Sequence, residues 1–295
     1  MNERYIDLHT HSLASDGTDS PCEVAEKAFE AELAAFALTD HDTVVGVEET
    51  MKRAMELGIE CIPGCEIAVH EEGFEEIHIL GLWTDWRHPD LLHFLDSQVK
   101  NRIRRNEQII AKLQGFGIDI TMDEVMALSH GGACGRPHIA RVLWHKGYVA
   151  DIRTAFVRYL GRHGSAYVPR ILSSPEKGIA ALAAGGGLVA LAHPCISNSV
   201  TLKKLDGLLK KYIPYGLTAV EAFHTVHTPF KQRMCLRMAA KHSLLVTGGS
   251  DYHGTVKPHA KIGFVHYGQR IPYRFLETMK EWRKARGLPL SFSLD

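Results

Sequence analysis

The chain has 295 residues, of which 45% are hydrophobic and 23% are charged, a balance typical of an ordinary globular protein. Its 34 basic residues equal its 34 acidic ones, and the resulting net charge of zero argues against a protein whose main task is to coat duplex nucleic acid. A chain of this length forms one large domain or two ordinary ones, and it can bury a core without disulfide bonds.

The six cysteines lie outside any C-x-x-C or zinc-finger spacing, so we expect reduced and mostly buried thiols. The first residues show no basic segment followed by an apolar one, and no apolar run reaches the length that spans a membrane. We therefore expect a cytoplasmic protein with no membrane contact. The sequence indicates no stable protein partner.

Short apolar runs recur along the chain, with helical patterns between them. They predict strands at Tyr5–Leu8, Ala35–Leu38, Cys61–Ile62, Ile77–Leu82, Leu188–Ala192, Thr218–Ala222 and Leu244–Val246, with a weaker candidate at Ala166–Val168. Helices are expected near residues 21–33, 46–57, 175–184 and 228–242. The first of these has a clear start, because Ser20, Pro21 and Glu23 form the pattern of a capping box with proline in the first turn.

This alternation predicts an α/β protein with parallel strands, either a regular or distorted β/α barrel or, as the runner-up, an open doubly wound sheet. Residues 88–162 break the alternation and are mostly helical in pattern, with Leu91, Leu92, Leu95 and Val99 on one face. We predict a barrel formed by residues 1–87 and 163–295. The helical insertion of residues 88–162 would serve as a lid or a substrate-binding subdomain.

Polar side chains stand at the end of nearly every predicted strand. They are His9 and His11, Asp40 and His41, Glu66, His78, His193, Glu221 and His224, and Asp251 and His253. The carboxyl ends of parallel strands meet on one face, where buried ionisable groups are costly unless they are paired or bind metal. Each residue alone is more often a packing or surface residue, but their joint placement indicates a site. The mixed nitrogen and oxygen donors suit two or three ions of Zn, Mn or Fe better than Ca.

Several of these segments resemble the motifs of the polymerase and histidinol phosphatase (PHP) superfamily. The matching segments are Asp7-Leu8-His9-Thr10-His11 with Ser15-Asp16-Gly17, Leu38-Thr39-Asp40-His41-Asp42, Gly64-Cys65-Glu66 with His78, Ala192-His193-Pro194, and Gly249-Ser250-Asp251-Tyr252-His253. The resemblance spans nearly the whole chain. It implies a distorted (β/α)7 barrel that holds up to three divalent ions.

The resemblance also implies a role for each matching residue. The first ion would take His9, His11, Glu66 and Asp251, the second Glu66, His78 and His193, and the third Asp16, His41 and His253. Catalysis would depend on His9, His11, Glu66, His193 and Asp251. Manganese is the expected metal, with zinc and iron as alternatives. A hydroxide supplied by the ions would attack phosphorus in line with the leaving oxygen.

Within the superfamily, the chain resembles the TrpH- and YciV-like branch of 3',5'-nucleoside bisphosphate phosphatases and 5'-to-3' exoribonucleases. Gly135-Arg136-Pro137-His138 and Glu221-Ala222-Phe223-His224 support this branch. The implied substrate is a small nucleotide, most simply the 3'-phosphate of a bisphosphate, or a short 5'-phosphorylated RNA. Arg136 is the first candidate for phosphate contact, ahead of His138 and His224. The alternative role for Arg136 is an ordinary surface salt bridge. Arg102, Arg104 and Arg105 form either a solvated helix face or a guide for RNA.

Three other functions compete with this prediction. A histidinol-phosphate phosphatase would share the metal motifs, although such a small substrate needs less enclosure than the insertion offers. A metal site could instead only regulate or stabilise a binding module. An amidohydrolase is a weaker alternative, because no Lys stands at a predicted strand end where a carbamylated, metal-bridging Lys would be needed.

Overall fold

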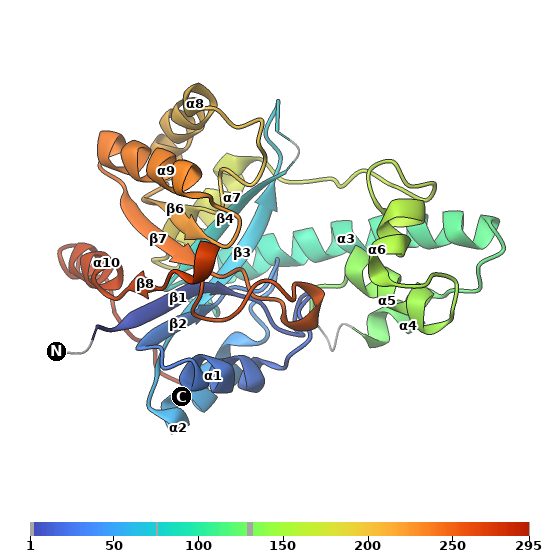
Figure 1. The fold of residues 1–295 in the computed structure, drawn as a ribbon, viewed down its shortest axis with the longest axis horizontal. Coiled ribbons are helices and arrows are strands. Elements are labelled where there is room, and N and C mark those ends of the chain that lie inside the picture. The colour runs from blue at the N-terminus through green and yellow to red at the C-terminus, as the bar shows by residue number, and fades with distance from the viewer. Residues whose placement is uncertain (1–2, 75, 129–131, 295) are drawn as a thin grey trace.

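The computed structural model describes residues 3–74, 76–128 and 132–294. A central sheet of eight strands has the order β7-β6-β5-β4-β3-β2-β1-β8. The strands are β1 (Tyr5–Thr10), β2 (Ala35–Leu38), β3 (Glu60–Val69), β4 (Ile77–Leu82), β5 (Leu188–Leu191), β6 (Ala219–His224), β7 (Leu245–Gly249) and β8 (Ile271–Pro272). Their curvature makes a nearly closed barrel, so the predicted α/β class and distorted barrel are confirmed (Figure 1).

The strand directions depart from the fully parallel arrangement that we expected. β4 runs antiparallel to both β3 and β5, and β8 runs antiparallel to β1, whereas the other paired strands are parallel. The physical reason for the direction of β4 is its connection. The few residues between Val69 and Ile77 allow a hairpin but are too short for the crossover that parallel strands need.

The barrel closes through the segment that follows β7. Tyr252 forms a parallel bridge with Thr10 of β1. Two backbone bonds accompany it: the Asp251 amide donates to the His9 carbonyl at 2.9 Å, and the His11 amide donates to the Tyr252 carbonyl at 2.9 Å. The first strand is therefore joined to the last part of the sheet by the same residues that carry polar side chains.

Two strand predictions were wrong in detail. The Ala166–Val168 candidate is not a strand; its apolar side chains pack with the insertion helices, and the Val168 carbonyl accepts a bond from Arg105 Nε at 2.8 Å. β3 is longer than the predicted Cys61–Ile62 because Pro63 and Gly64 continue the strand.

Helices surround the barrel on its outside (Figure 1). They are α1 (Pro21–Glu30), α2 (Val47–Leu57), α7 (Pro175–Ala184), α8 (Leu202–Tyr212), α9 (Pro229–His242) and α10 (Arg274–Lys284), with short turns at η2 (Ile213–Tyr215), η3 (Gly254–Val256) and η4 (His266–Gly268). The capping box predicted at Ser20 is present, since its side chain accepts from the Glu23 amide and Glu23 returns a bond to the Ser20 amide. Among the described residues, no helix is both long and apolar enough to cross a membrane.

The remaining helices project together to one side of the barrel (Figure 1). They are α3 (Pro89–Gly115), α4 (Met122–Ala127), α5 (Arg136–His145), α6 (Ile152–Ala155) and η1 (Phe156–Leu160). A separate apolar cluster that includes Ile109, Leu113, Ile139 and Leu143 holds them together. The division into a barrel and an insertion of residues 88–162 stays a prediction.

Candidate metal centre

The polar side chains at the strand ends converge on one end of the barrel. Glu66 lies at their centre on β3 and is fully buried. Its two carboxylate oxygens lie close to ring nitrogens of histidines from β1, the loop after β2, β4 and the loop after β5. The distances are 3.4 Å to His9 Nε2, 3.4 Å to His11 Nε2, 2.9 Å to His41 Nδ1, 3.0 Å to His78 Nδ1 and 3.0 Å to His193 Nε2.

The loop after β7 supplies a second carboxylate to this centre. Asp251 Oδ1 lies 3.4 Å from His11 Nε2 and 3.7 Å from His9 Nε2. The Asp251 carboxylate also pairs with Lys257 Nζ at 2.6 Å. His9 of β1 and His11, which directly follows β1, therefore stand between Glu66 and Asp251, as the grouping proposed for a first ion requires.

A neighbouring group forms around Asp16. Its Oδ1 lies 3.2 Å from His253 Nε2 and 4.0 Å from His41 Nε2. The donor atoms of His11, Asp16, His41 and His253 all lie within 4.8 Å of one another. The structure thus brings all nine predicted metal-binding residues together, and it places His11 beside the third group as well as the first.

Several donor atoms in this cluster are buried without a hydrogen-bond partner among the described residues. They are the Nε2 atoms of His9, His11 and His253, Asp16 Oδ1 and Glu66 Oε2. A buried polar atom left unpaired is costly, and such atoms are rare in folded proteins. Lone pairs of imidazole and carboxylate that face one another fit divalent cations, so this donor set suits the predicted ions.

Metal binding needs ionised carboxylates and neutral imidazoles. The pKa shifts of Glu66, His11 and His193 run in that direction, whereas, against the effect of burial, the Glu66 carboxylate raises the pKa of His78 to about 10. Although burial opposes its charge, nearby His41 and His78 hold the pKa of Glu66 well below its usual range. Burial, together with the neighbouring His253, lowers the pKa of His11 well below its usual value. Burial likewise lowers the pKa of His193 to about 4.

One residue missed as a site residue by sequence reasoning orients this cluster. Glu221 of β6 is fully buried; it lies 3.0 Å from His9 Nδ1 and accepts a bond from the His193 amide at 2.7 Å. Metal-binding histidines commonly donate their second ring nitrogen to such a carboxylate. The sequence signal was present, because a charged residue inside an apolar strand needs a partner.

Three of the seven described non-glycine residues with a positive φ angle lie in the same region. Asp42, His193 and Asp251 have φ angles of 53°, 24° and 57°, in the left-handed region that disfavours non-glycine residues. Such strain persists only where the surrounding contacts impose it, and it is common at functional sites.

An ion-pair network connects the long helix α3 to the centre. The buried carboxylate of Asp42 accepts from Arg102 Nε at 2.8 Å and also pairs with Arg170. Arg170 Nη1 contacts Glu76 at 2.6 Å, and Glu76 lies 3.3 Å from His78 Nε2. Arg102 is therefore neither a solvated residue nor a free guide for RNA.

The three predicted substrate contacts have different surroundings. Arg136 donates to the Leu160 carbonyl at 3.1 Å, while His138 is buried, with Nδ1 accepting from the Gly135 amide and Nε2 lacking a partner among the described residues. His224 lies inside the cluster, with Nε2 3.4 Å from Asp251 Oδ2. Their roles in substrate binding stay predictions.

A hollow of about 640 Å³ opens beside His78 and His193. Phe74, Ile196 and Val200 contribute apolar surface to it, and Glu76, Ser197 and Ser199 contribute polar groups. It is large enough for a small organic molecule.

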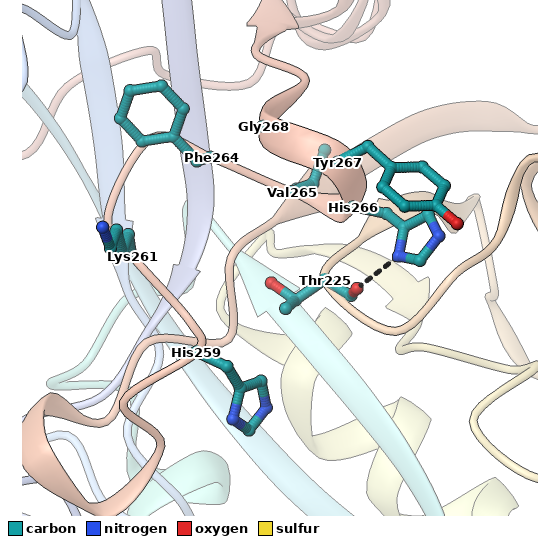
Figure 2. Close-up of a pocket in the computed structure, with 8 residues that line it drawn as sticks. All are labelled: Thr225, His259, Lys261, Phe264, Val265, His266, Tyr267 and Gly268. Carbon is teal, nitrogen blue, oxygen red and sulfur yellow. Dashed lines mark hydrogen bonds between the residues drawn. The ribbon is translucent and has the colours of Figure 1, made fainter.

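A second hollow of about 490 Å³ lies on the other side of the β6 end. Figure 2 shows its floor at Thr225, whose carbonyl accepts a bond from His266 Nδ1 at 3.1 Å. Lys261, Phe264 and Tyr267 also line it, and Tyr267 is 86% exposed. Thr225 Oγ1 donates to the Ser250 carbonyl at 2.6 Å, which places this hollow next to the loop of Asp251.

Comparison with known proteins gives four consistent likenesses. The family model of the PHP domain matches residues 7–160. The chain is 37% identical over 86% of its length to a 5'-3' exoribonuclease of Haemophilus influenzae, 91% of which is covered. It is 32% identical over 84% of its length to a 3',5'-nucleoside bisphosphate phosphatase of Chromobacterium violaceum, 87% of which is covered. A crystal structure of a metal-dependent phosphoesterase from Bifidobacterium adolescentis superposes with a TM-score of 0.83 at 30% identity, covering 97% of this chain and 98% of the other.

Proposed function

The chain belongs to the PHP domain family and is a metal-dependent phosphoesterase, and we propose that its substrates are phosphate esters of nucleotides. The foremost substrate is the 3'-phosphate of 3',5'-nucleoside bisphosphates, and short 5'-phosphorylated RNA is the second. The convergence of five histidines on the buried Glu66 carboxylate carries the phosphoesterase part of this proposal. The names of the two relatives support the nucleotide part.

The proposed ligands fall into three groups, of which the first two share Glu66. The first is His9, His11, Glu66 and Asp251, the second is Glu66, His78 and His193, and the third is Asp16, His41 and His253. When bound, divalent ions such as Mn²⁺ lower the pKa of water and neutralise charge on phosphoryl oxygens. Glu221 keeps His9 oriented, because its carboxylate contacts Nδ1 and leaves Nε2 directed at Glu66 and Asp251.

Cationic side chains beside the centre support a substrate with more than one phosphate. The guanidinium groups of Arg102 and Arg170 stand at Asp42, next to the His78 side of the centre. Burial and repulsion by the nearby Arg136 lower the pKa of Arg105 to about 10. Guanidinium groups placed beside the centre favour an anionic ligand.

The two hollows offer places for the rest of the substrate. The one beside His78 and His193 combines apolar and polar surface, which suits a nucleoside. The one in Figure 2 combines exposed aromatic rings with Lys261, a composition that binds single-stranded nucleic acid by stacking and charge. A substrate that extends from the metal centre into this second hollow would be the end of an RNA strand.

The decisive experiment measures phosphate release from 3',5'-bisphosphoadenosine by the purified protein with Mn²⁺. Histidinol phosphate is assayed in parallel. Release from the nucleotide alone supports the proposal, and short 5'-phosphorylated RNAs then distinguish phosphatase from exonuclease activity. Release from histidinol phosphate alone would refute the nucleotide assignment.

Two variants make this assay specific. His78→Ala removes a proposed ligand 3.0 Å from Glu66 and should abolish release. His242→Ala is the matched control and should retain activity. It removes a histidine of the outer helix α9 that pairs with Asp206 at 2.7 Å. Equal loss in both variants would indicate damage to the fold in place of a ligand role.

A further inference from the structure

A second cluster of metal-binding side chains lies behind the end of β5 and contains sulfur in place of carboxylate. Cys195, His227 and Cys235 each place one donor atom within 4.8 Å of the other two. All three are buried, with exposed fractions of 0%, 1% and 0%. They come from the loop after β5, the turn before α9 and α9 itself, so only the folded barrel brings them together.

The two sulfur atoms already have a spacing that suits a shared metal ion. Cys195 Sγ and Cys235 Sγ are 3.6 Å apart. Two thiolates bound to one tetrahedral zinc ion at about 2.3 Å each stand about 3.8 Å apart. The side chains would therefore need only a small adjustment to bind such an ion.

The imidazole of His227 belongs to this cluster and has one nitrogen without a hydrogen-bond partner among the described residues. His227 Nδ1 lies 3.0 Å from the Ala222 carbonyl oxygen, and because that oxygen can only accept, Nδ1 carries the proton. Nε2 therefore has a lone pair, and it is buried without a hydrogen-bond partner among the described residues. A histidine whose second nitrogen donates to a backbone carbonyl is the usual form of a metal-binding histidine.

We propose that Cys195, His227 and Cys235 form a binding site for a thiophilic divalent cation of the zinc class, separate from the phosphoesterase centre. Thiolate and imidazole select such ions over Mg²⁺, Ca²⁺ and Mn²⁺, which prefer oxygen. On binding, both thiols lose their protons to solvent, and a fourth donor such as water completes the ion's coordination. The ion would tie the loop that carries His193 to the turn that follows His224.

Cobalt(II) tests this site without interference from the phosphoesterase centre. Reduced, metal-free protein is titrated with Co²⁺ without oxygen, and the near-ultraviolet band of thiolate-to-cobalt charge transfer is recorded. The proposed phosphoesterase ligands are nitrogen and oxygen donors only, so they do not produce this band. Because the phosphoesterase centre also binds Co²⁺, we expect the band to stop rising at the amplitude of one thiolate-bound Co²⁺ per chain, whatever the amount of metal added.

Variants locate the band on the chain. The double variant Cys195→Ser with Cys235→Ser should lose it, and its zinc content should fall by one ion per chain. Cys134→Ser, which removes a buried thiol from the insertion core, is the matched control and should retain the band. Circular dichroism of each variant shows whether the fold is intact.

His227→Gln provides a second test that leaves both thiols in place. It should weaken Co²⁺ binding at least about tenfold, because one of three protein donors is lost. A wild-type protein that shows no band, or a double variant that keeps it, would overturn the proposal. Unchanged Co²⁺ affinity in His227→Gln would overturn the assignment of His227 as a ligand of this site.

Discussion

Replacement of Glu221 by Gln tests whether metal binding at the centre depends on the Glu221 carboxylate, which contacts the second ring nitrogen of His9. Glu221 is fully buried and makes two contacts, one to His9 Nδ1 at 3.0 Å and one from the His193 amide at 2.7 Å. A glutamine oxygen can still accept the amide bond, but its NH₂ group then meets the N–H of His9. The imidazole must lose that contact or move its proton to Nε2, the nitrogen that faces Glu66 and Asp251.

The expected magnitude follows from this single lost bond. A hydrogen bond to a charged group contributes about 1.5–3 kcal/mol. Loss of such an outer contact typically weakens metal binding about 10- to 100-fold, equivalent to about 1.4–2.7 kcal/mol. We therefore expect Glu221→Gln to raise the Mn²⁺ concentration at half-maximal activity by this factor while the fold remains intact.

The assay is a titration of metal-free protein with Mn²⁺, followed by phosphate release and, independently, by calorimetry. Glu71→Gln is the matched control, since Glu71 is also a buried glutamate, pairing with Lys211 Nζ at 2.7 Å and Tyr212 Oη at 2.8 Å, and it is none of the proposed ligands. A Mn²⁺ affinity within about twofold of wild type in Glu221→Gln would refute the reasoning.

Three further predictions concern other parts of the molecule. Tyr267→Ala should slow the hydrolysis of short RNA but not of mononucleotides, because this 86% exposed ring can only stack on a base beyond the reacting one. Equal effects on both substrates would contradict this. Asp42→Asn should destabilise the protein by about 3–5 kcal/mol in urea unfolding, since Arg102 and Arg170 lose their shared carboxylate, whereas a loss below about 1 kcal/mol would show that the pairs are dispensable. Metal-free protein should lose thermal stability as the pH falls below about 4.3, the pKa of a glutamate in the unfolded chain. The folded pKa of Glu66 is depressed, so its charge stabilises the fold above that pH and is lost on protonation below it. A melting temperature independent of pH between about 5 and 3 would refute this.

Much of the barrel could be predicted because its strands are short apolar runs with clear boundaries. β2 and β4 have the predicted bounds, and the proline and glycine signals placed the helix starts near their true positions. The direction of β4 could not be read from Ile77–Leu82, since strand direction depends on the length of a connection and on neighbours that are distant in sequence. β8 has only two residues, too few to leave an alternating pattern.

The candidate centre was predictable where a polar residue ends an apolar run, as at His9 and Glu66. No comparable signal pointed to Arg170, which follows a segment without regular structure and meets Asp42 only through the fold. The cluster of Cys195, His227 and Cys235 was invisible for the same reason, because spacing rules recognise ligands that are close in sequence. Local pattern thus predicts residues on single elements, whereas contacts between elements require the assembled barrel.

The bridge between Thr10 and Tyr252 has a consequence for the order of events during synthesis. His9 leaves the ribosome well before Asp251 and the loop that closes the barrel. At a translation rate of about 5–20 residues per second, roughly 12–48 s separate the two. During this interval the nascent chain holds His9 and His11 without their final carboxylate partner, and the centre forms only after Asp251 has also been made.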